Sequence, residues 1–380
     1  MLQDALPLDD EPTTADQDSR ARAIRRRRNT FRTHPVPTDP MGKVPRAWSL
    51  RQGLQQSVAP ELAEIVAWFE QEPDARERFR WALRDSLDEL LDGQRTGRWA
   101  YQHLSKTEKT YLGTAVEVNL TKEFEFANGD DLDWRIAARD VDCKFSKDMG
   151  GWEIPMEMYL CDDHEDRQGK ADHPALVTWM NDDTSRWAAG LVTITDERLR
   201  WRTDKTTGEV RRAYNRDNKR RLADSASTDI YWLWGGLQQD LPRNLLLHME
   251  PAVRDRIFSF PRSGQARVNQ LFREVRESIV SRQMVLTVAQ QDDAPKRARD
   301  ARLKLQNEGL LVLGHQETHP RVAAALGLPV PVKGEWISVR VVPVEPTDSR
   351  PFFSVAEQRW ARSHRDEPVT PAPKLDIVWT

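Results

Sequence analysis

Apolar and polar residues alternate in two neighbouring stretches near the middle of the 380-residue chain. Apolar residues occupy every second position over residues 132–136 and again over residues 141–145. A period of two predicts β-strands with one buried face. Only a few residues, around 138–140, separate the two stretches, so we expect them to form a hairpin.

Other hydrophobic patterns extend this element into an α/β domain. The apolar runs at 175–179 and 187–194 predict inner strands of the same sheet. Helical periodicity predicts helices over residues 57–70 and 74–92. The sequence Ser-Lys-Thr-Glu from residue 105 fits a capping box that starts a further helix. Together these elements predict an α/β (α+β) domain with a mixed sheet.

A second group of elements follows near the C-terminus. The predicted helices and strands cover residues 263–278, 282–290, 292–308 (helices), 310–313 and 336–342 (strands). We expect Pro343 to end the last strand. This order is typical of winged helix-turn-helix domains, in which a basic helix enters the major groove. A generic α+β domain with a solvated helix face is the alternative. The candidate DNA-binding residues here are Arg267, Lys296, Arg297, Arg299 and Arg302.

Composition narrows the possible classes of protein. The net charge is −3, which argues against a sequence-indifferent coat for nucleic acids but not against a specific DNA-binding protein. Mean hydropathy is −0.71, and no apolar run is long enough to span a membrane. Two cysteines, Cys143 and Cys161, favour a reducing compartment, so we expect a cytoplasmic protein. The Cys/His-containing stretch around residues 161–173 matches no standard zinc spacing, and we expect a solvated loop there.

The predicted hairpin also brings charged side chains close together. Folding it places Asp133 close to Asp142, with Lys144 on the same face as Asp142. Two carboxylates can hold a hard divalent ion such as magnesium, and a nearby lysine can position or deprotonate an attacking water. Glu117 lies beside the core stripe of its helix, where a carboxylate needs a metal or a basic partner unless it faces solvent. A surface hairpin with an Asp142–Lys144 ion pair is an equally acceptable interpretation.

The spacing of Asp133, Asp142 and Lys144 resembles the PD-(D/E)-x-K nuclease superfamily. Six longer motifs, at 92–99, 106–110, 141–146, 264–269, 288–293 and 326–331, resemble the NaeI family of type II restriction endonucleases. The resemblance covers roughly residues 74–345. It implies that Glu117, Asp133 and Asp142 are metal-site carboxylates for Mg2+ and that Lys144 is the catalytic lysine. It also implies a winged-helix (CAP-like) domain that binds another copy of the DNA.

The function implied by this resemblance is magnesium-dependent, sequence-specific cleavage of double-stranded DNA, stimulated by a second DNA site. The expected partners are two copies of double-stranded DNA, and a palindromic target implies a homodimer. A monomeric nicking or repair nuclease is an alternative, as is a DNA-binding regulator with a vestigial nuclease fold. The target sequence cannot be read from these residues.

The expected domain organisation follows from the same patterns. The boundaries are a tail and linker at 1–47, an endonuclease domain at 48–232, a linker at 233–244, a winged-helix domain at 245–346 and a Pro-rich tail at 347–380. Two basic stretches, at 20–32 and 211–221, can face either phosphate or solvent. The resemblance also implies that two segments, at 159–173 and 200–213, are insertions relative to the family, and such insertions often alter DNA contacts.

Overall fold

The computed structural model describes residues 14–15, 17–19, 31–159 and 173–375. The chain divides into two compact units, which we describe separately. The central unit comprises Pro35–Leu91 and Trp99–Met249, and the C-terminal unit comprises Met1–His34, Asp92–Arg98 and Glu250–Thr380. The stretch at 20–30 and most of the segment at 159–173, including Cys161, lie outside the described residues.

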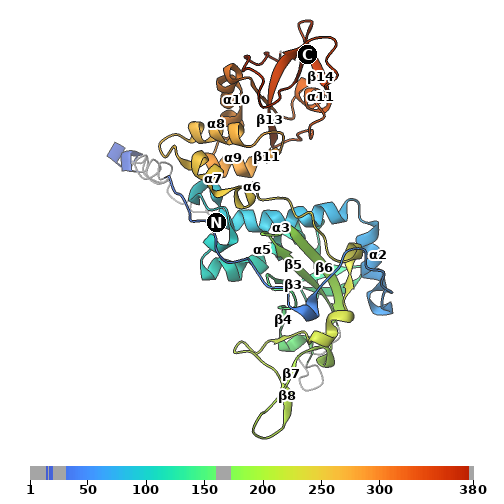
Figure 1. The fold of residues 1–380 in the computed structure, drawn as a ribbon. Coiled ribbons are helices and arrows are strands. Elements are labelled where there is room, and N and C mark those ends of the chain that lie inside the picture. Colours follow the sequence, from blue (N-terminus) through green and yellow to red (C-terminus); the bar gives the residue numbers. More distant parts are fainter. Residues whose placement is uncertain (1–13, 16, 20–30, 160–172, 376–380) are drawn as a thin grey trace, which may run out of the picture. The chain divides into compact units, whose positions relative to one another are not determined.

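A six-stranded mixed sheet forms the middle of the central unit (Figure 1). Its spatial order is β1-β2-β3-β5-β6-β10, in which β3 and β5 are parallel and the other neighbours are antiparallel. The predicted hairpin and the two predicted inner strands are therefore confirmed as β2–β3, β5 and β6. The strands are β1 (Ala127–Asn128), β2 (Trp134–Ile136), β3 (Arg139–Ser146), β5 (Pro174–Asn181), β6 (Arg186–Thr193) and β10 (Tyr231–Trp232).

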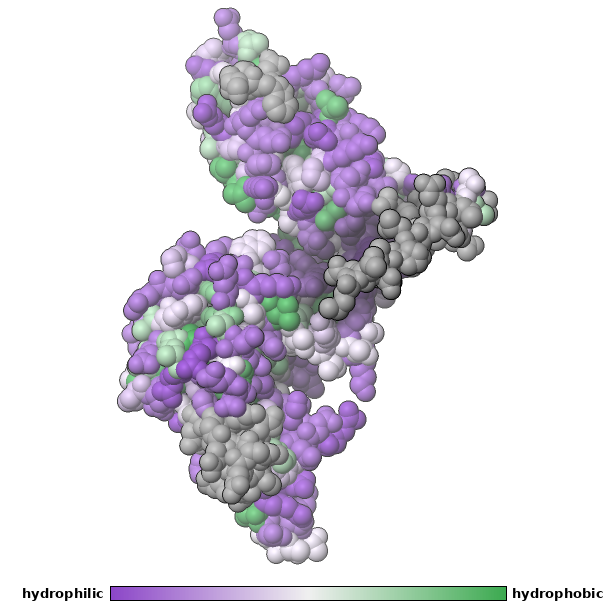
Figure 2. Space-filling model, turned by 180° about the vertical axis from the view of Figure 1, so that it is seen from behind, coloured by the Kyte–Doolittle hydropathy of each residue, from purple (hydrophilic) through white to green (hydrophobic). Residues whose placement is uncertain are grey.

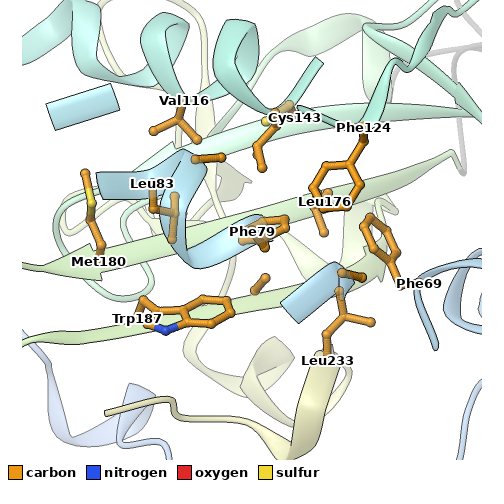
Figure 3. Close-up of a cluster of buried hydrophobic side chains, with 14 of the residues drawn as sticks. Phe69, Phe79, Leu83, Val116, Phe124, Cys143, Leu176, Met180, Trp187 and Leu233 are labelled. Carbon is orange, nitrogen blue, oxygen red and sulfur yellow. The ribbon is translucent and has the colours of Figure 1, made fainter. Parts of the chain in front are cut away.

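Helices α2 (Ala63–Gln71), α3 (Ala75–Leu91) and α5 (Lys106–Phe124) contribute to the core on one face of this sheet. Figure 3 shows Phe79 and Leu83 of α3 directed towards Leu176 and Trp187 of the sheet. Helix α2 begins later than predicted, because Pro60 starts a short 3-10 turn ahead of it. The predicted capping box of α5 is confirmed, since Ser105 and Glu108 exchange hydrogen bonds.

The opposite face of the sheet is covered mainly by aromatic side chains and irregular chain. Ala175 and Val177 of β5 pack there with Trp48, Trp152 and Trp232. Because β5 and β6 are buried on both faces, their near-continuous apolar sequences need no alternation. Two small antiparallel ribbons complete the unit. They pair β4 (Glu153–Ile154) with β9 (Arg220–Arg221), and β7 (Trp201–Thr203) with β8 (Val210–Arg212).

Two stretches that we expected to be linkers contribute to this core instead. Met41, in the Pro-rich stretch 33–47, is 2% exposed and belongs to the helix-side cluster. Leu233 and Leu241, from the expected interdomain linker, are buried in the same cluster. Apolar side chains inside a polar, Pro-rich context explain why composition alone indicated linkers.

The C-terminal unit combines a helical layer with an antiparallel sheet. Strands β11 and β12 both pair with β13, and β15 links β13 to β14. All three predicted helices are present with slightly shorter bounds. The helices are α7 (Pro251–Phe258), α8 (Gly264–Glu274), α9 (Arg282–Ala289), α10 (Ala294–Leu305) and α11 (Thr318–Ala325), and the strands are β11 (Ile279–Ser281), β12 (Leu310–Leu313), β13 (Glu335–Val344), β14 (Phe352–Val355) and β15 (Gln358–Arg362).

One expectation for this unit is wrong. Pro343 does not end its strand, because β13 continues to Val344. In this part of β13 the only paired neighbour among the described strands is β15, so the missing N–H of Pro343 breaks no second ladder. Part of the expected Pro-rich tail is regular, because residues 352–362 form the β14–β15 hairpin.

The motif at 92–99 has a structural role in the C-terminal unit. Residues Gly93–Thr96 form the short helix α4, which packs on α9. A Cβ on Gly93 would lie 2.1 Å from Oγ1 of Thr287 and 2.9 Å from the carbonyl oxygen of Arg98. Only glycine permits this approach, which explains its place in the motif.

Replacing Gly93 by alanine should therefore destabilise the C-terminal unit by about 1–3 kcal/mol, the usual range for overpacking. Thermal unfolding measures this effect. The matched control is Gly113→Ala in α5, where the new Cβ would meet only Phe145 at 4.0 Å. That change should leave stability the same or raise it by about 1 kcal/mol. Equal stabilities for the two variants would contradict the packing of α4 on α9.

Candidate active site

The β2–β3 hairpin positions three of the four predicted active-site residues. Trp134 pairs with Val141, and continuing this register places Asp133 opposite Asp142. The two-residue turn is Ala137–Ala138, both with positive φ (49° and 62°), one residue earlier than we expected. Lys144 lies two residues after Asp142 on β3, so both side chains leave the same face of the strand.

Asp142 and Lys144 form a close ion pair in this structure. Asp142 is 5% exposed, and Lys144 also donates to the carbonyl oxygen of Cys143 at 3.2 Å. Burial opposes the charge on Lys144, but attraction to Asp142 outweighs it and raises the lysine pKa above its ordinary value. Lys144 is therefore a protonated ammonium at neutral pH. Asp133 accepts a hydrogen bond from the backbone N–H of Cys143 at 2.7 Å, which ties it to the same strand.

Helix α5 supplies the fourth predicted residue, Glu117. Burial, reinforced by the negative charges of Asp133 and Asp142, raises the pKa of Glu117, while Lys144 partly offsets this effect. The four side chains are thus close enough to interact electrostatically. Cys143, between the two charged residues of β3, is buried in the core, and burial raises its pKa well above the ordinary value. Cys143 is therefore a packing residue of the core.

Three carboxylates are a chemically suitable ligand set for a hard divalent cation. The raised pKa of Glu117 reflects its burial first and then repulsion by Asp133 and Asp142, and a bound cation would relieve that repulsion. Among the described residues, however, no three His, Cys, Asp or Glu side chains already converge as a metal site. Asp142 contacts Lys144, and Asp133 contacts the Cys143 backbone. Metal binding would therefore require side-chain rotations at a preassembled cluster.

The burial of the Glu117 carboxylate beside two other carboxylates has a measurable cost. Above the ordinary glutamate pKa, the charged form of Glu117 is disfavoured in the folded state, so this group lowers stability as the pH rises towards neutrality. Replacing Glu117 by glutamine should raise the melting temperature of the metal-free protein at pH 7.5. The same change should weaken the stabilisation produced by added Ca²⁺. Exposed Glu64, replaced by glutamine, is the control. A variant that melts lower than wild type without metal would contradict the view that the folded state disfavours a charged Glu117.

The predicted DNA-binding residues separate into two groups. Arg267 is 3% exposed and donates to the carbonyl oxygens of Phe260, Val288 and Ala289. Burial lowers its pKa to about 10. Its donors are therefore engaged inside the fold, and it is not placed to bind DNA. Arg302 is partly buried and donates to the carbonyl oxygen of Val312 at 2.9 Å.

The remaining candidates lie on α10. Arg297 forms an ion pair with Asp293 one turn earlier, at 3.0 Å. Lys296 and Arg299 are exposed, as are Leu303, at 70%, and Lys304. These side chains recur at helical spacing and give α10 an exposed face that is basic with one apolar residue.

Sequence reasoning missed a buried polar network in the central unit. The guanidinium of Arg84 on α3 donates to Asp182 at 2.6 Å and to Asp88 at 2.7 Å. Asp182, which is 1% exposed, also accepts from the side chain of Asn244 at 3.0 Å, and its carbonyl oxygen contacts His248 at 2.9 Å. The available signal was an arginine on the core-facing side of an otherwise amphipathic helix.

Comparison with known proteins identifies the family to which the chain belongs. The sequence matches the family described as "Restriction endonuclease NaeI" over residues 63–371. The chain is also 43% identical over 313 residues to the type II restriction enzyme NaeI of Lentzea aerocolonigenes, which covers 80% of this chain and 90% of that protein. The chain belongs to the NaeI restriction endonuclease family.

As a member of the NaeI family, the protein is a site-specific deoxyribonuclease with double-stranded DNA as its substrate class. Type II restriction endonucleases generally use a divalent metal ion, which agrees with the carboxylate cluster described above. The match extends further in both directions than the motifs that first indicated it. In the described part of the chain, no helix is long and apolar enough to cross a membrane.

Proposed function

We propose that this protein is a magnesium-dependent restriction endonuclease that cleaves at the cluster of Glu117, Asp133, Asp142 and Lys144. The supporting observation is that three carboxylates and one ammonium, from α5 and the β2–β3 hairpin, lie close enough to interact electrostatically. Together with the family membership, this grouping of side chains favours an active nuclease over a DNA-binding regulator with a vestigial nuclease fold.

Each residue has a defined role in this proposal. Glu117, Asp133 and Asp142 would hold Mg2+, which when bound polarises a phosphate and lowers the pKa of a coordinated water. Lys144, whose pKa is raised, keeps its proton at neutral pH. It would orient the attacking water and stabilise negative charge on the phosphate oxygens. The buried Cys143 and Val141 fix the strand that carries Asp142 and Lys144.

A digest of a sequenced phage genome tests this proposal. With added magnesium, the protein should produce discrete fragments whose mapped ends share one short palindrome, which the family resemblance predicts to be GC-rich. Cleavage of both strands at a palindrome would also support the proposed homodimer, because two symmetry-related active sites then act on one target. Breaks in only one strand would favour a nicking enzyme instead. Fragment ends that share no common sequence would contradict a restriction activity.

We further propose that the C-terminal unit is a winged-helix domain that binds a second copy of the DNA. The element order α8, β11, α9, α10, β12, β13 supports this, since β11 and β12 both flank β13. Helices α9 and α10 are separated by a short turn at Gln290, which has a φ of 49°. In this arrangement α10 is the helix that would enter the major groove.

The exposed cations of α10 give a direct prediction. The double variant Lys296→Ala, Arg299→Ala should lose most of the stimulation by a second site while cutting a one-site plasmid at nearly the wild-type basal rate. Each lost phosphate contact should also lower the salt slope of effector binding by about 0.9 units. The assay compares one-site and two-site plasmids, with and without an oligonucleotide carrying the site.

The matched control replaces Arg365 and Lys374, two exposed cations outside α10, by alanine. This control variant should respond to a second site as wild type does. If wild type cuts both plasmids equally and the oligonucleotide has no effect, the two-site proposal fails. The α10 variant should then weaken binding of the cleaved site itself.

A further inference from the structure

The central unit carries a strongly basic ribbon with no assigned role. We propose that residues 200–221, hereafter the basic ribbon, bind the backbone of duplex DNA flanking the cleaved site. This inference rests on the proposed position of the cleavage site near Asp142. The segment contains only three acidic residues, in a chain whose net charge is −3. Its nine basic residues are Arg200, Arg202, Lys205, Arg211, Arg212, Arg216, Lys219, Arg220 and Arg221.

Two of these cations, Arg212 and Arg220, anchor one end of the basic ribbon, hereafter its root. The Arg220 side chain is fully buried, pairs with Asp196 and lies 4.9 Å from the rings of both Tyr159 and Trp201. Arg212 pairs with the same Asp196 at 2.9 Å. These contacts fix the direction in which β7 and β8 leave the sheet, so the ribbon is a positioned element.

The cations beyond the root face solvent. Arg202, Lys205 and Lys219 are exposed, and within the described ranges no acidic side chain pairs with them. Figure 1 shows β7 and β8 projecting away from the six-stranded sheet of the same unit. Seen from behind in Figure 2, this projecting end carries mostly hydrophilic side chains.

The basic ribbon also buries little surface of its own. All three residues of β7 and two of the three in β8 are exposed, and Val210 on β8 is 61% exposed. An isolated two-stranded hairpin is at best marginally stable in water, because no hydrophobic face supports it. A ribbon with charged, uncovered faces is better explained by a ligand that covers it than by a role in packing.

The register of the sheet places the end of β6, from which the chain leads to this ribbon, near the candidate active site. Asp142 of β3 pairs with Ala175 of β5, and the adjacent Pro174 pairs with Thr193, the last residue of β6. The chain therefore leaves the sheet towards the ribbon at the same end as Asp142. Neighbouring strands are about 4.8 Å apart, so Thr193 lies roughly 10 Å from Asp142 across two strand spacings.

Charge complementarity identifies the ligand as duplex DNA. Phosphates along a duplex present a regular series of negative charges, and the major groove is wide enough for a two-stranded ribbon. Arg202, Lys205 and Lys219 suit phosphate contacts, which position a duplex without reading its bases. Since a DNA bound for cleavage extends beyond its recognition site, the ribbon would contact flanking phosphates at that end of the sheet.

The test replaces Arg202, Lys205 and Lys219 together by alanine. Binding is measured in Ca²⁺ over a range of salt concentrations, with a site-containing duplex that has either about 4 or about 15 flanking base pairs on each side. On the long duplex, the salt slope should fall by about 0.9 units per lost contact. On the short duplex, affinity and the magnesium-dependent cleavage rate should match wild type. The control triple variant replaces exposed Arg46, Arg51 and Lys122, and its salt slopes should be unchanged.

Three outcomes would overturn the inference. The first is an unchanged slope and affinity on the long duplex. The second is an equal loss on both duplexes, which would place the ribbon at the cleaved site itself. The third is an altered sedimentation coefficient of the DNA-free variant, which would assign the ribbon to contacts between protein copies. A wild-type protein that fails to cut either duplex would instead count against the proposed cleavage site, whatever the binding data show.

Discussion

Replacing Asp142 by alanine is expected to abolish DNA cleavage while leaving specific DNA binding nearly intact. Asp142 is a buried carboxylate in contact with Lys144, and we propose that it is a metal ligand. Losing it should remove several kcal/mol of stabilisation of the developing charge, equivalent to a rate loss of about 1,000-fold or more. The measurement is single-turnover cleavage of a one-site duplex in magnesium, with binding measured separately in Ca²⁺.

The control for this prediction is Asp148→Ala, which removes another carboxylate that pairs with a neighbouring lysine, Lys147, at 2.8 Å. Its cleavage rate should stay within a few-fold of wild type. An Asp142→Ala protein that still cuts at an appreciable fraction of the wild-type rate would refute the assignment of this residue.

The second large effect is expected at Arg84, and it concerns stability. Replacing Arg84 by alanine leaves the carboxylate of Asp182, which is 1% exposed, without its charged partner. Breaking a buried ion pair in this way typically costs about 3–5 kcal/mol. Urea denaturation followed by tryptophan fluorescence should therefore show a much lower midpoint for the central unit. If the single variant does not fold, the double variant Arg84→Met, Asp182→Asn should recover part of the stability, because it removes both charges of the Arg84–Asp182 pair and leaves only the more exposed Asp88 without its partner.

An exposed ion pair provides the comparison. Arg256 pairs with Glu274 at 2.7 Å, and its side chain is 53% exposed. Its replacement by alanine should cost less than about 1 kcal/mol, as is usual for surface pairs. Similar losses for Arg84→Ala and Arg256→Ala would contradict the view that the buried network holds α3 against the sheet.

Local pattern was enough to predict most elements that surround the candidate site. The alternation around Trp134 and Val141 predicted the hairpin, and the uninterrupted apolar runs predicted β5 and β6. These elements follow from short-range periodicity, which the sequence carries directly. The grouping of Asp133, Asp142 and Lys144 then followed from strand register. Assigning Glu117 to the same site required the family resemblance, because the position of a residue on a helix does not indicate which strand it faces.

What pattern could not predict depends on contacts between distant residues. Arginine is a residue type that often contacts DNA, but the side chain of Arg267 donates its hydrogen bonds to three carbonyl groups of its own unit. Met41 lies in a Pro-rich stretch, yet it fills the core of the central unit. Gly93 packs against Thr287, nearly two hundred residues away. Long-range packing of this kind leaves no local periodic signal.

The most direct test of the proposed active site is the location of a bound metal ion. Crystals of the protein with uncleavable phosphorothioate DNA and Mn²⁺ should show an anomalous peak within about 2.5 Å of carboxylate oxygens of Asp133 and Asp142, next to the scissile phosphate. The same peak should be absent from crystals of the Asp142→Ala variant. A peak bound by other side chains, or a scissile phosphate far from this cluster, would contradict the account.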